Sequence, residues 1–237
     1  MARKVLVMIP AYNEEKTVGE VVKSTLALYP DFKIVVVDDG SEDRTVERAE
    51  EAGADVVSLP FHCGGSIAIQ TGYMVAANDG YDYTVKIDAD GQHRPEEITK
   101  LLNPLINDEA DMTMGSRYLT LNDNHSSAVK EGGIVFSSTL VSLFRKMEIT
   151  DVTSGMRAWS RKAIQTLMPI YIARKPIEDS VFWVAETILA SKKGLRLKEV
   201  SINVLPRKHG RSKSFSFDKM LLYPFRLLIT LIQETRR

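Results

Sequence analysis

The chain has 237 residues, Lys plus Arg balance Asp plus Glu at 31 each, and 44% of the residues are hydrophobic. This composition is that of an ordinary globular protein and excludes a disordered or disulfide-rich chain. The net charge of zero argues against a dedicated nucleic-acid-binding protein, because such proteins need excess positive charge to displace counterions. We therefore expect no nucleic-acid partner.

Strand and helix patterns alternate through the first half of the chain. Short apolar runs predict buried strands over residues 5–9, 34–37, 56–59, 83–87 and 112–114. Apolar residues at helical spacing predict helices over residues 15–29, 43–52, 67–77 and 95–106. This alternation predicts an α/β fold with a mostly parallel sheet flanked by helices. In such sheets ligands bind beyond the carboxyl ends of the strands.

The second half is less regular. We predict a helix over 133–147, a loop or short strand over 151–159, a helix over 177–191, a strand over 195–204, a basic loop over 206–216 and an amphipathic helix over 217–233 that Pro224 interrupts. No repeat or linker divides the chain. We expect one domain over residues 1–216, with a nucleotide-binding half of about 1–117 and an acceptor half of about 118–216, and then a C-terminal amphipathic helical segment over 217–237.

The single cysteine, Cys63, excludes an internal disulfide and fits a reducing compartment. No stretch of roughly 20 apolar residues predicts a membrane-spanning helix. The apolar run at the N-terminus ends at Pro10, and this run is too short for a signal peptide. We therefore expect a cytoplasmic protein.

Two acidic side chains follow the fourth predicted strand. In an extended segment Asp88 and Asp90 face the same side, where two carboxylates repel each other unless a cation lies between them. Oxygen ligands suit Mg²⁺ or Mn²⁺, and Gln92 could add a carbonyl oxygen. The alternative is a polar turn without a metal. The polar ends of the other strands favour a site at this edge.

Asp38 and Asp39 follow the second predicted strand. One carboxylate, more favourably that of Asp39, is predicted to accept hydrogen bonds from a nucleobase or a ribose. The alternative is a turn in which Asp38 caps the next helix. Both can hold, because adjacent residues of a strand point in opposite directions.

Six segments together resemble family-two glycosyltransferases with the Rossmann-like GT-A fold, most closely the dolichol- or polyprenyl-phosphate sugar transferases. They are residues 9–14 (Ile-Pro-Ala-Tyr-Asn-Glu), 37–41 (Val-Asp-Asp-Gly-Ser), 88–93 (Asp-Ala-Asp-Gly-Gln-His), 115–117 (Gly-Ser-Arg), 151–158 and 207–213. The resemblance implies transfer of a sugar, with inversion, from a nucleoside-diphosphate sugar to a polyprenyl phosphate. A hydroxyl of a glycan is the alternative acceptor, and a non-catalytic nucleotide-sugar-binding module is the alternative of another class.

The resemblance also implies roles for particular residues. The nucleotide would be held by Pro10, Ala11, Tyr12, Glu14, Asp39 and Asp88. Asp88, Asp90 and Gln92 would face the diphosphate through Mg²⁺ or Mn²⁺, and Asp90 and Arg117 would act in catalysis. Phosphate groups of donor or acceptor would meet Arg117 and a cationic loop of Arg207, Lys208, Arg211 and Lys213. The alternative for that loop is an ordinary solvated surface.

Glu178 and Asp179 open a predicted helix in a region where relatives place a catalytic carboxylate. Either side chain could deprotonate a hydroxyl acceptor as a general base. The alternative is capping of the helix N-terminus, where acidic residues are favoured. An acceptor that is already a phosphate needs little deprotonation, and the carboxylate would then orient it.

Two departures from the family pattern leave the donor's sugar and base open. Relatives often have Asn and Lys near position 62, where this chain reads His62-Cys63-Gly64, and often have Asp where Arg94 stands.

The apolar C-terminal segment, with cations beside it, predicts a helix that lies on the cytoplasmic face of a membrane. The alternatives are packing onto the domain and pairing of two subunits in a homo-oligomer.

Overall fold

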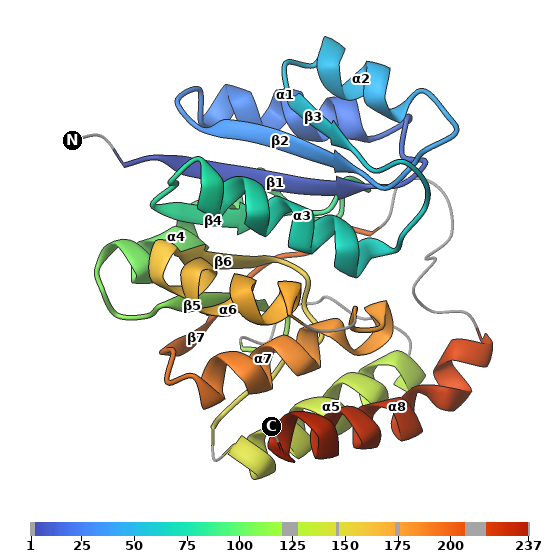
Figure 1. Ribbon diagram of the computed structural model, residues 1–237, viewed down its shortest axis with the longest axis vertical. Coiled ribbons are helices and arrows are strands. Elements are labelled where there is room, and N and C mark those ends of the chain that lie inside the picture. The colour runs from blue at the N-terminus through green and yellow to red at the C-terminus, as the bar shows by residue number, and fades with distance from the viewer. Residues whose placement is uncertain (1–2, 120–127, 146, 174–175, 207–216, 237) are drawn as a thin grey trace.

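The computed structural model describes residues 3–119, 128–145, 147–173, 176–206 and 217–236 (Figure 1). The predicted cations Arg207, Lys208, Arg211 and Lys213 lie outside these residues. The described strands form one sheet in the order β3-β2-β1-β4-β6-β5-β7. They are β1 (Val5–Ala11), β2 (Lys33–Asp38), β3 (Asp55–Ser58), β4 (Tyr83–Lys86), β5 (Met112–Ser116), β6 (Arg157–Ser160) and β7 (Leu197–Ser201). β6 is antiparallel to both of its neighbours, and the other pairs are parallel. The predicted α/β fold with a mostly parallel sheet is confirmed.

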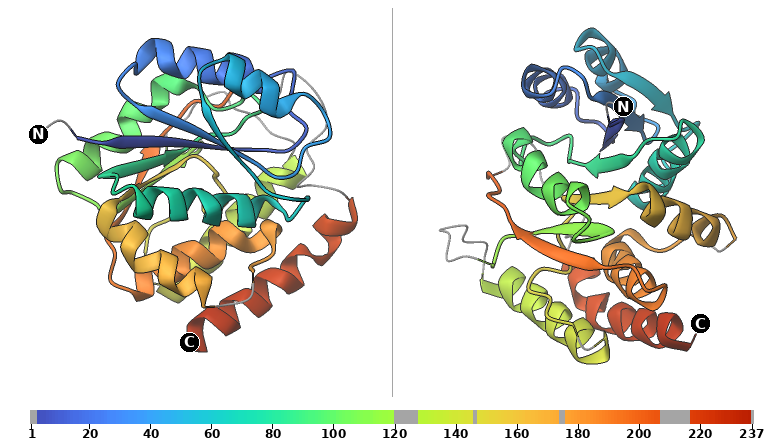
Figure 2. Two further views of the ribbon diagram at one scale, coloured as in Figure 1. Left: turned by 45° about the horizontal axis from the view of Figure 1, so that its top comes forward. Right: turned by 90° about the vertical axis from the view of Figure 1, so that its left-hand side faces the viewer.

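Helices cover both faces of this sheet (Figure 2). They are α1 (Val18–Leu28), α2 (Thr45–Glu51), α3 (Gly65–Asn78), α4 (Ile98–Ile106), α5 (Ala128–Arg145), α6 (Arg161–Ile172), α7 (Phe182–Lys192) and α8 (Phe217–Arg236). Short 3-10 turns, η1 (Pro95–Glu97) and η2 (Asp179–Val181), precede α4 and α7.

The side chains of β1 alternate between two apolar cores. Leu6 and Met8 join the core beneath α3, α6 and α7, whereas Val7 and Ile9 join the core beneath α1 and α4. All four side chains are fully buried. This two-sided burial explains why a strand appears in the sequence as a continuous apolar run rather than an alternating one.

Several predictions need correction. The sequence pattern did not predict α6, which Ser160 caps by accepting a hydrogen bond from the Ala163 N–H at 3.3 Å. The chain between Asp88 and Asp90 is a turn rather than an extended strand. α8 continues through Pro224, which is exposed, so water can satisfy the carbonyl group that the proline leaves unpaired. None of the helices in the described part of the chain is both long and apolar enough to cross a bilayer.

Candidate active site

A cavity of about 720 Å³ lies at the carboxyl ends of β1, β2, β4 and β5. It is lined by every predicted site residue that the structure describes: Pro10, Ala11, Tyr12, Glu14, Asp39, Asp88, Asp90, Gln92, Arg117, Glu178 and Asp179. The parallel register of β1, β2 and β4 brings the residues that follow these strands to one edge of the sheet, where Arg117 after β5 and Glu178 and Asp179 before α7 join them. The contacts of each residue decide what it can do there.

Hydrogen bonds join the loops that follow β1 and β2. Ser41 Oγ accepts the Asn13 N–H at 2.9 Å, and Thr45 Oγ1 accepts the Glu14 N–H at 2.8 Å. In return Asn13 Oδ1 accepts the Glu42 N–H at 2.9 Å. Asn13 has a left-handed φ of 53°, a conformation that asparagine tolerates better than most residues. The turn that carries Tyr12 and Glu14 is thus fixed before any ligand binds.

The Asp39 carboxylate is buried and holds the loop that leads to α3. Its Oδ1 accepts the Cys63 N–H at 2.7 Å, and its Oδ2 accepts the Gly64 N–H at 3.0 Å. The Nδ1 of His62 lies 2.8 Å from the same Oδ2. The carboxylate therefore organises this loop, in addition to the predicted contact with a base or ribose.

The rings of Tyr12 and His62 are stacked, with centroids 3.8 Å apart and an angle of 14° between their planes. His62 therefore covers one face of the Tyr12 ring, which the family resemblance places in the nucleotide site. Both side chains line the cavity.

The turn of Asp88 and Asp90 is tethered to the segment that precedes the predicted basic loop. Asp90 Oδ1 accepts the Gln92 N–H at 3.0 Å, which closes the turn. The Gln92 side-chain amide donates to the Leu205 carbonyl at 3.1 Å, and the Leu205 N–H donates to the Gln92 carbonyl at 2.9 Å. The acidic turn and the chain entering residues 207–216 are thus hydrogen-bonded to each other.

Lys86 is a cavity residue that the sequence analysis missed. Its side chain is only 5% exposed and its ammonium pairs with Asp88 Oδ1. The same ammonium lies 5.2 Å from the centre of the Trp183 ring, and a Cβ on Gly155 would lie 2.7 Å from it. A lysine at the end of an apolar strand was the available signal, because lysine is almost never fully buried unless it is paired.

His93 lies beneath the acidic turn as a neutral imidazole. Burial lowers the pKa of His93 to about 4; the nearby Asp88 carboxylate opposes this shift, and Lys86 and Arg117 reinforce it. The Nδ1 of His93 accepts the Asp88 N–H at 3.0 Å, so that nitrogen carries a lone pair. Its approach of 3.3 Å to Asp88 Oδ2 is therefore not an ion pair.

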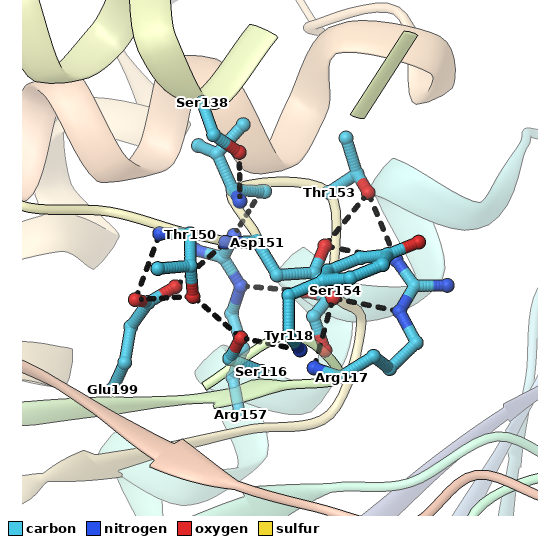
Figure 3. A network of polar contacts seen from close by, with 11 residues as sticks. Ser116, Arg117, Tyr118, Ser138, Thr150, Asp151, Thr153, Ser154, Arg157 and Glu199 are labelled. Atoms are coloured by element: carbon cyan, nitrogen blue, oxygen red, sulfur yellow. Dashed lines mark hydrogen bonds and ion pairs between the residues drawn. The ribbon is translucent and has the colours of Figure 1, made fainter. Parts of the chain in front are cut away.

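Arg117 is clamped at the wall of the cavity by a buried aspartate (Figure 3). Its Nε and Nη2 atoms donate to the two oxygens of Asp151 at 2.6 and 2.8 Å, and Nη2 also donates to Thr153 Oγ1 at 3.1 Å. Asp151 is fully buried. Burial favours the neutral form of Arg117, but the bond to Asp151 outweighs it, and the pKa of Arg117 is raised.

The segment that carries Asp151 is held in turn by β7 (Figure 3). Glu199 accepts the N–H groups of Thr150 and Asp151, each at 2.8 Å. Burial raises the pKa of Glu199, and these hydrogen bonds oppose the shift. The position of Arg117 is therefore set by a chain of contacts that ends on β7.

The two carboxylates near α7 have different partners. Asp179 accepts the N–H groups of Gly65 at 3.0 Å and Ser66 at 2.7 Å, so it caps α3 rather than its own helix. Glu178 pairs with Arg226 of α8. The alternative to a catalytic role, capping of the helix that follows these residues, is not what the structure shows, because η2 and α7 have no side-chain cap.

α8 contributes to the wall of the cavity. Tyr223 lines it, and the Tyr223 hydroxyl lies 2.9 Å from Ser137 Oγ on α5. α8 also packs against η2 and α7. Packing onto the domain, one of the alternatives for this segment, is thus what the structure shows.

A divalent cation fits the acidic turn only if a bound ligand supplies part of its coordination. Among the described residues, no group of three or more His, Cys, Asp or Glu side chains could hold a metal ion. Asp88 and Asp90 nevertheless line one cavity and offer oxygen atoms, the ligands that Mg²⁺ and Mn²⁺ prefer. Magnesium sites commonly combine one or two carboxylates with phosphate oxygens. The donor set therefore fits a cation that is bound together with a phosphorylated ligand.

Comparison with known proteins agrees with this geometry. The model of the family described as Glycosyl transferase family 2 matches residues 6–168. The chain is 30% identical to UDP-N-acetylglucosamine--dolichyl-phosphate N-acetylglucosaminyltransferase of Methanococcus voltae, over 90% of each protein. It is 31% identical to polyprenol monophosphomannose synthase of Mycolicibacterium smegmatis, over 89% of this chain and 81% of the relative.

A solved structure confirms the GT-A fold. The chain resembles glucosyl-3-phosphoglycerate synthase from Mycobacterium tuberculosis, in complex with Mn²⁺, uridine diphosphate and phosphoglyceric acid, with a TM-score of 0.75 and 21% identity. The superposition covers 98% of this chain and 78% of that one. At this identity the likeness establishes the fold.

Proposed function

The chain belongs to glycosyl transferase family 2, and from this premise we propose that it transfers a sugar from a nucleoside-diphosphate sugar to a polyprenyl phosphate, with inversion at the anomeric carbon. The relatives described above are named for dolichyl phosphate and for polyprenol monophosphomannose, which supports a lipid phosphate as the acceptor.

One observation carries the proposal: a single cavity joins the Tyr12 ring, the acidic turn of Asp88 and Asp90, and the Arg117 guanidinium. A nucleoside-diphosphate sugar has a planar base, two phosphates and a sugar. An aromatic ring suits the base, and positive charge suits the phosphates. Tyr12 follows β1, the acidic turn follows β4 and Arg117 follows β5, and these strands lie in the same order across the sheet.

The leaving group of the reaction is a nucleoside diphosphate, on which negative charge develops as the glycosidic bond breaks. Asp88 and Asp90, with Gln92 beside them, would hold a Mg²⁺ or Mn²⁺ ion, which neutralises that charge when it is bound. The Lys86 ammonium, paired with Asp88, contributes a second positive charge there. Buried positive charge of this kind stabilises a developing anion more strongly than the same charge in water.

The contacts of Asp179 favour a phosphate acceptor over a hydroxyl. Both of its carboxylate oxygens accept backbone hydrogen bonds from the start of α3. These bonds hold the carboxylate against the first turn of α3, with a lone pair of each oxygen engaged there rather than directed at an acceptor hydroxyl. A phosphate acceptor is already ionised and needs no base, so Asp179 fixes the wall of the site while the phosphate oxygen attacks.

We further propose that the face formed by α5 and α8 docks on the membrane that holds the acceptor. The two helices lie side by side in Figures 1 and 2 and share the Ser137–Tyr223 contact. Their exposed apolar side chains are Val135, Phe136, Leu143, Leu222, Phe225, Leu228, Ile229 and Ile232. An amphipathic helix of this kind lies in the headgroup layer. With α8 in that layer, the cavity that Tyr223 lines would lie next to the lipid phosphate.

Calorimetry with a panel of nucleoside diphosphates tests the proposal. We expect one nucleotide to bind tightly in the presence of Mn²⁺, and binding to be lost with a chelator and in Asp90→Ala. The matched control is Asp31→Ala, which removes an exposed aspartate outside the cavity. The corresponding nucleotide sugar should then give transfer to a polyprenyl phosphate.

Two results would contradict the proposal in different ways. If no nucleoside diphosphate binds with Mn²⁺ present, the catalytic function is wrong. If a nucleotide binds but the sugar passes only to a glycan hydroxyl, the donor site stands and the acceptor is wrong.

A further inference from the structure

The stacked pair of Tyr12 and His62 lies beside the Asp39 carboxylate, which His62 contacts. The two rings are parallel to within 14°, at a centroid distance of 3.8 Å. His62 Nδ1 lies 2.8 Å from Asp39 Oδ2. The three side chains line the cavity.

We propose that His62 is a base-binding residue of the donor site: Tyr12 and His62 form the two walls of a slot, closed on each other in the free protein, into which a planar nucleobase inserts above Asp39. The inference rests on the proposed function, since it assigns a further residue to the nucleotide site. It concerns a position where the chain departs from the usual family pattern.

The chemistry of the slot matches a nucleobase. Two parallel aromatic faces suit a planar ring, because stacking is favourable on both sides and does not depend on the exact base. The carboxylate of Asp39 accepts N–H groups, which bases such as uracil and guanine present on their edge. The imidazole of His62 now makes both kinds of contact, with the Tyr12 face and with the Asp39 carboxylate.

The surroundings of the slot allow the His62 side chain to move while its backbone stays fixed. The Cys63 and Gly64 N–H groups are bound to Asp39, at 2.7 and 3.0 Å. A Cβ on Gly40 would lie 2.5 Å from the Phe61 carbonyl carbon, so this loop is packed tightly against the end of β2. The His62 side chain, in contrast, is 51% exposed. Its ring can therefore move outward by one ring thickness and admit a base.

The test compares His62→Ala and His62→Phe with the wild-type protein, using UDP, GDP and, as a probe without a base, pyrophosphate, all with Mn²⁺. We expect His62→Ala to bind the preferred nucleoside diphosphate roughly 10-fold more weakly, because one stacking face is lost. His62→Phe should recover most of that loss. Affinity for pyrophosphate should change less than about twofold in either variant.

Thermal unfolding of both variants serves as the control for folding, and a half-exposed side chain is expected to leave the melting temperature close to that of the wild type. Unchanged or tighter nucleotide binding by His62→Ala would overturn the slot, since His62 would then be a bystander or a competitor. An equal loss of pyrophosphate binding would overturn it too, because the effect would not concern the base. If the wild-type protein binds no nucleoside diphosphate of the panel, the proposed function fails and the slot with it.

Discussion

At the scale of single residues, two carboxylates of the cavity, the buried Asp39 and the exposed Asp179, act on the backbone. Asp39 holds the loop of His62, Cys63 and Gly64, and Asp179 holds the first turn of α3. Each carboxylate thereby connects segments that lie far apart in the sequence. Such contacts preorganise a site, because the side chains around it are fixed before the ligand arrives.

Asp179→Asn separates the two kinds of acceptor. If the acceptor is a phosphate, as proposed, no proton is removed, and we expect kcat to fall less than about 10-fold, with the acidic limb of the pH–rate profile retained. A general base for a hydroxyl would instead contribute about 100-fold or more. The measurement is kcat against pH with a polyprenyl phosphate acceptor.

The matched control for this variant is Glu178→Gln, which changes the neighbouring carboxylate but leaves the cap of α3 intact. A loss of more than about 100-fold in Asp179→Asn alone, with a flattened acidic limb, would show that Asp179 is a base.

At the scale of elements, α8 has two faces with different environments. Leu227, Thr230 and Leu231 are buried, and α8 packs on α7 and η2. The opposite face exposes Phe225 (67%) and Ile229 (53%). A surface helix is normally polar on its outer face, so this apolar face needs a partner, and the proposed acceptor makes a membrane the natural one.

Phe225→Glu combined with Ile229→Glu should weaken cosedimentation with anionic liposomes at least about 10-fold, because each side chain contributes roughly 1.5–3 kcal/mol when it is buried. Leu28→Glu, which changes an exposed apolar residue of α1, should have no effect.

Nucleotide binding by the double variant should equal that of the wild type, since neither residue lines the cavity. Unchanged liposome binding would contradict membrane docking by this face, and a loss of dimers in sedimentation analysis would show that the face pairs two subunits instead.

At the scale of the whole molecule, the sheet has two edges with different tasks. The carboxyl edge carries the cavity, whereas the amino end of β5 carries a cluster that joins β5, α6 and β7. Asp111 accepts hydrogen bonds from Arg196 Nε at 3.1 Å and Lys162 Nζ at 3.2 Å. Burial alone would raise the pKa of Asp111, but the bonds from Arg196 and Lys162 lower it to about 2.

Asp111→Asn is therefore expected to lower the free energy of unfolding at neutral pH without changing nucleotide binding. A carboxyl whose pKa is lower in the folded protein than in the unfolded chain stabilises the fold above its unfolded pKa of 3.8. That stabilisation is lost as the pH falls towards 2. The difference between variant and wild type in urea unfolding should thus be constant above about pH 5 and shrink at lower pH.

Asp31→Asn, an exposed substitution, is the control and should shift unfolding by no more than about 0.5 kcal/mol. A difference between Asp111→Asn and wild type that stays the same down to pH 2 would show that the charge of Asp111 does not stabilise the fold.

Local patterns in the sequence determined the strands of the parallel part and the residues at their ends. A strand buried on both faces must be a continuous apolar run, and a polar turn must follow where it leaves the sheet. These two requirements are local, so the segments ending in Pro10, Asp39 and Asp90 could be recognised without a structure. The motif order then identified the family.

Only the tertiary structure decided which side chains meet. The contact of Lys86 with the Trp183 ring, the clamp of Asp151 on Arg117 and the stacking of His62 on Tyr12 all depend on how segments far apart in the chain approach one another. The same holds for Asp179, which caps a helix more than 100 residues away in the sequence. Side chains of that separation are brought together by strand order and register, which local spacing does not encode.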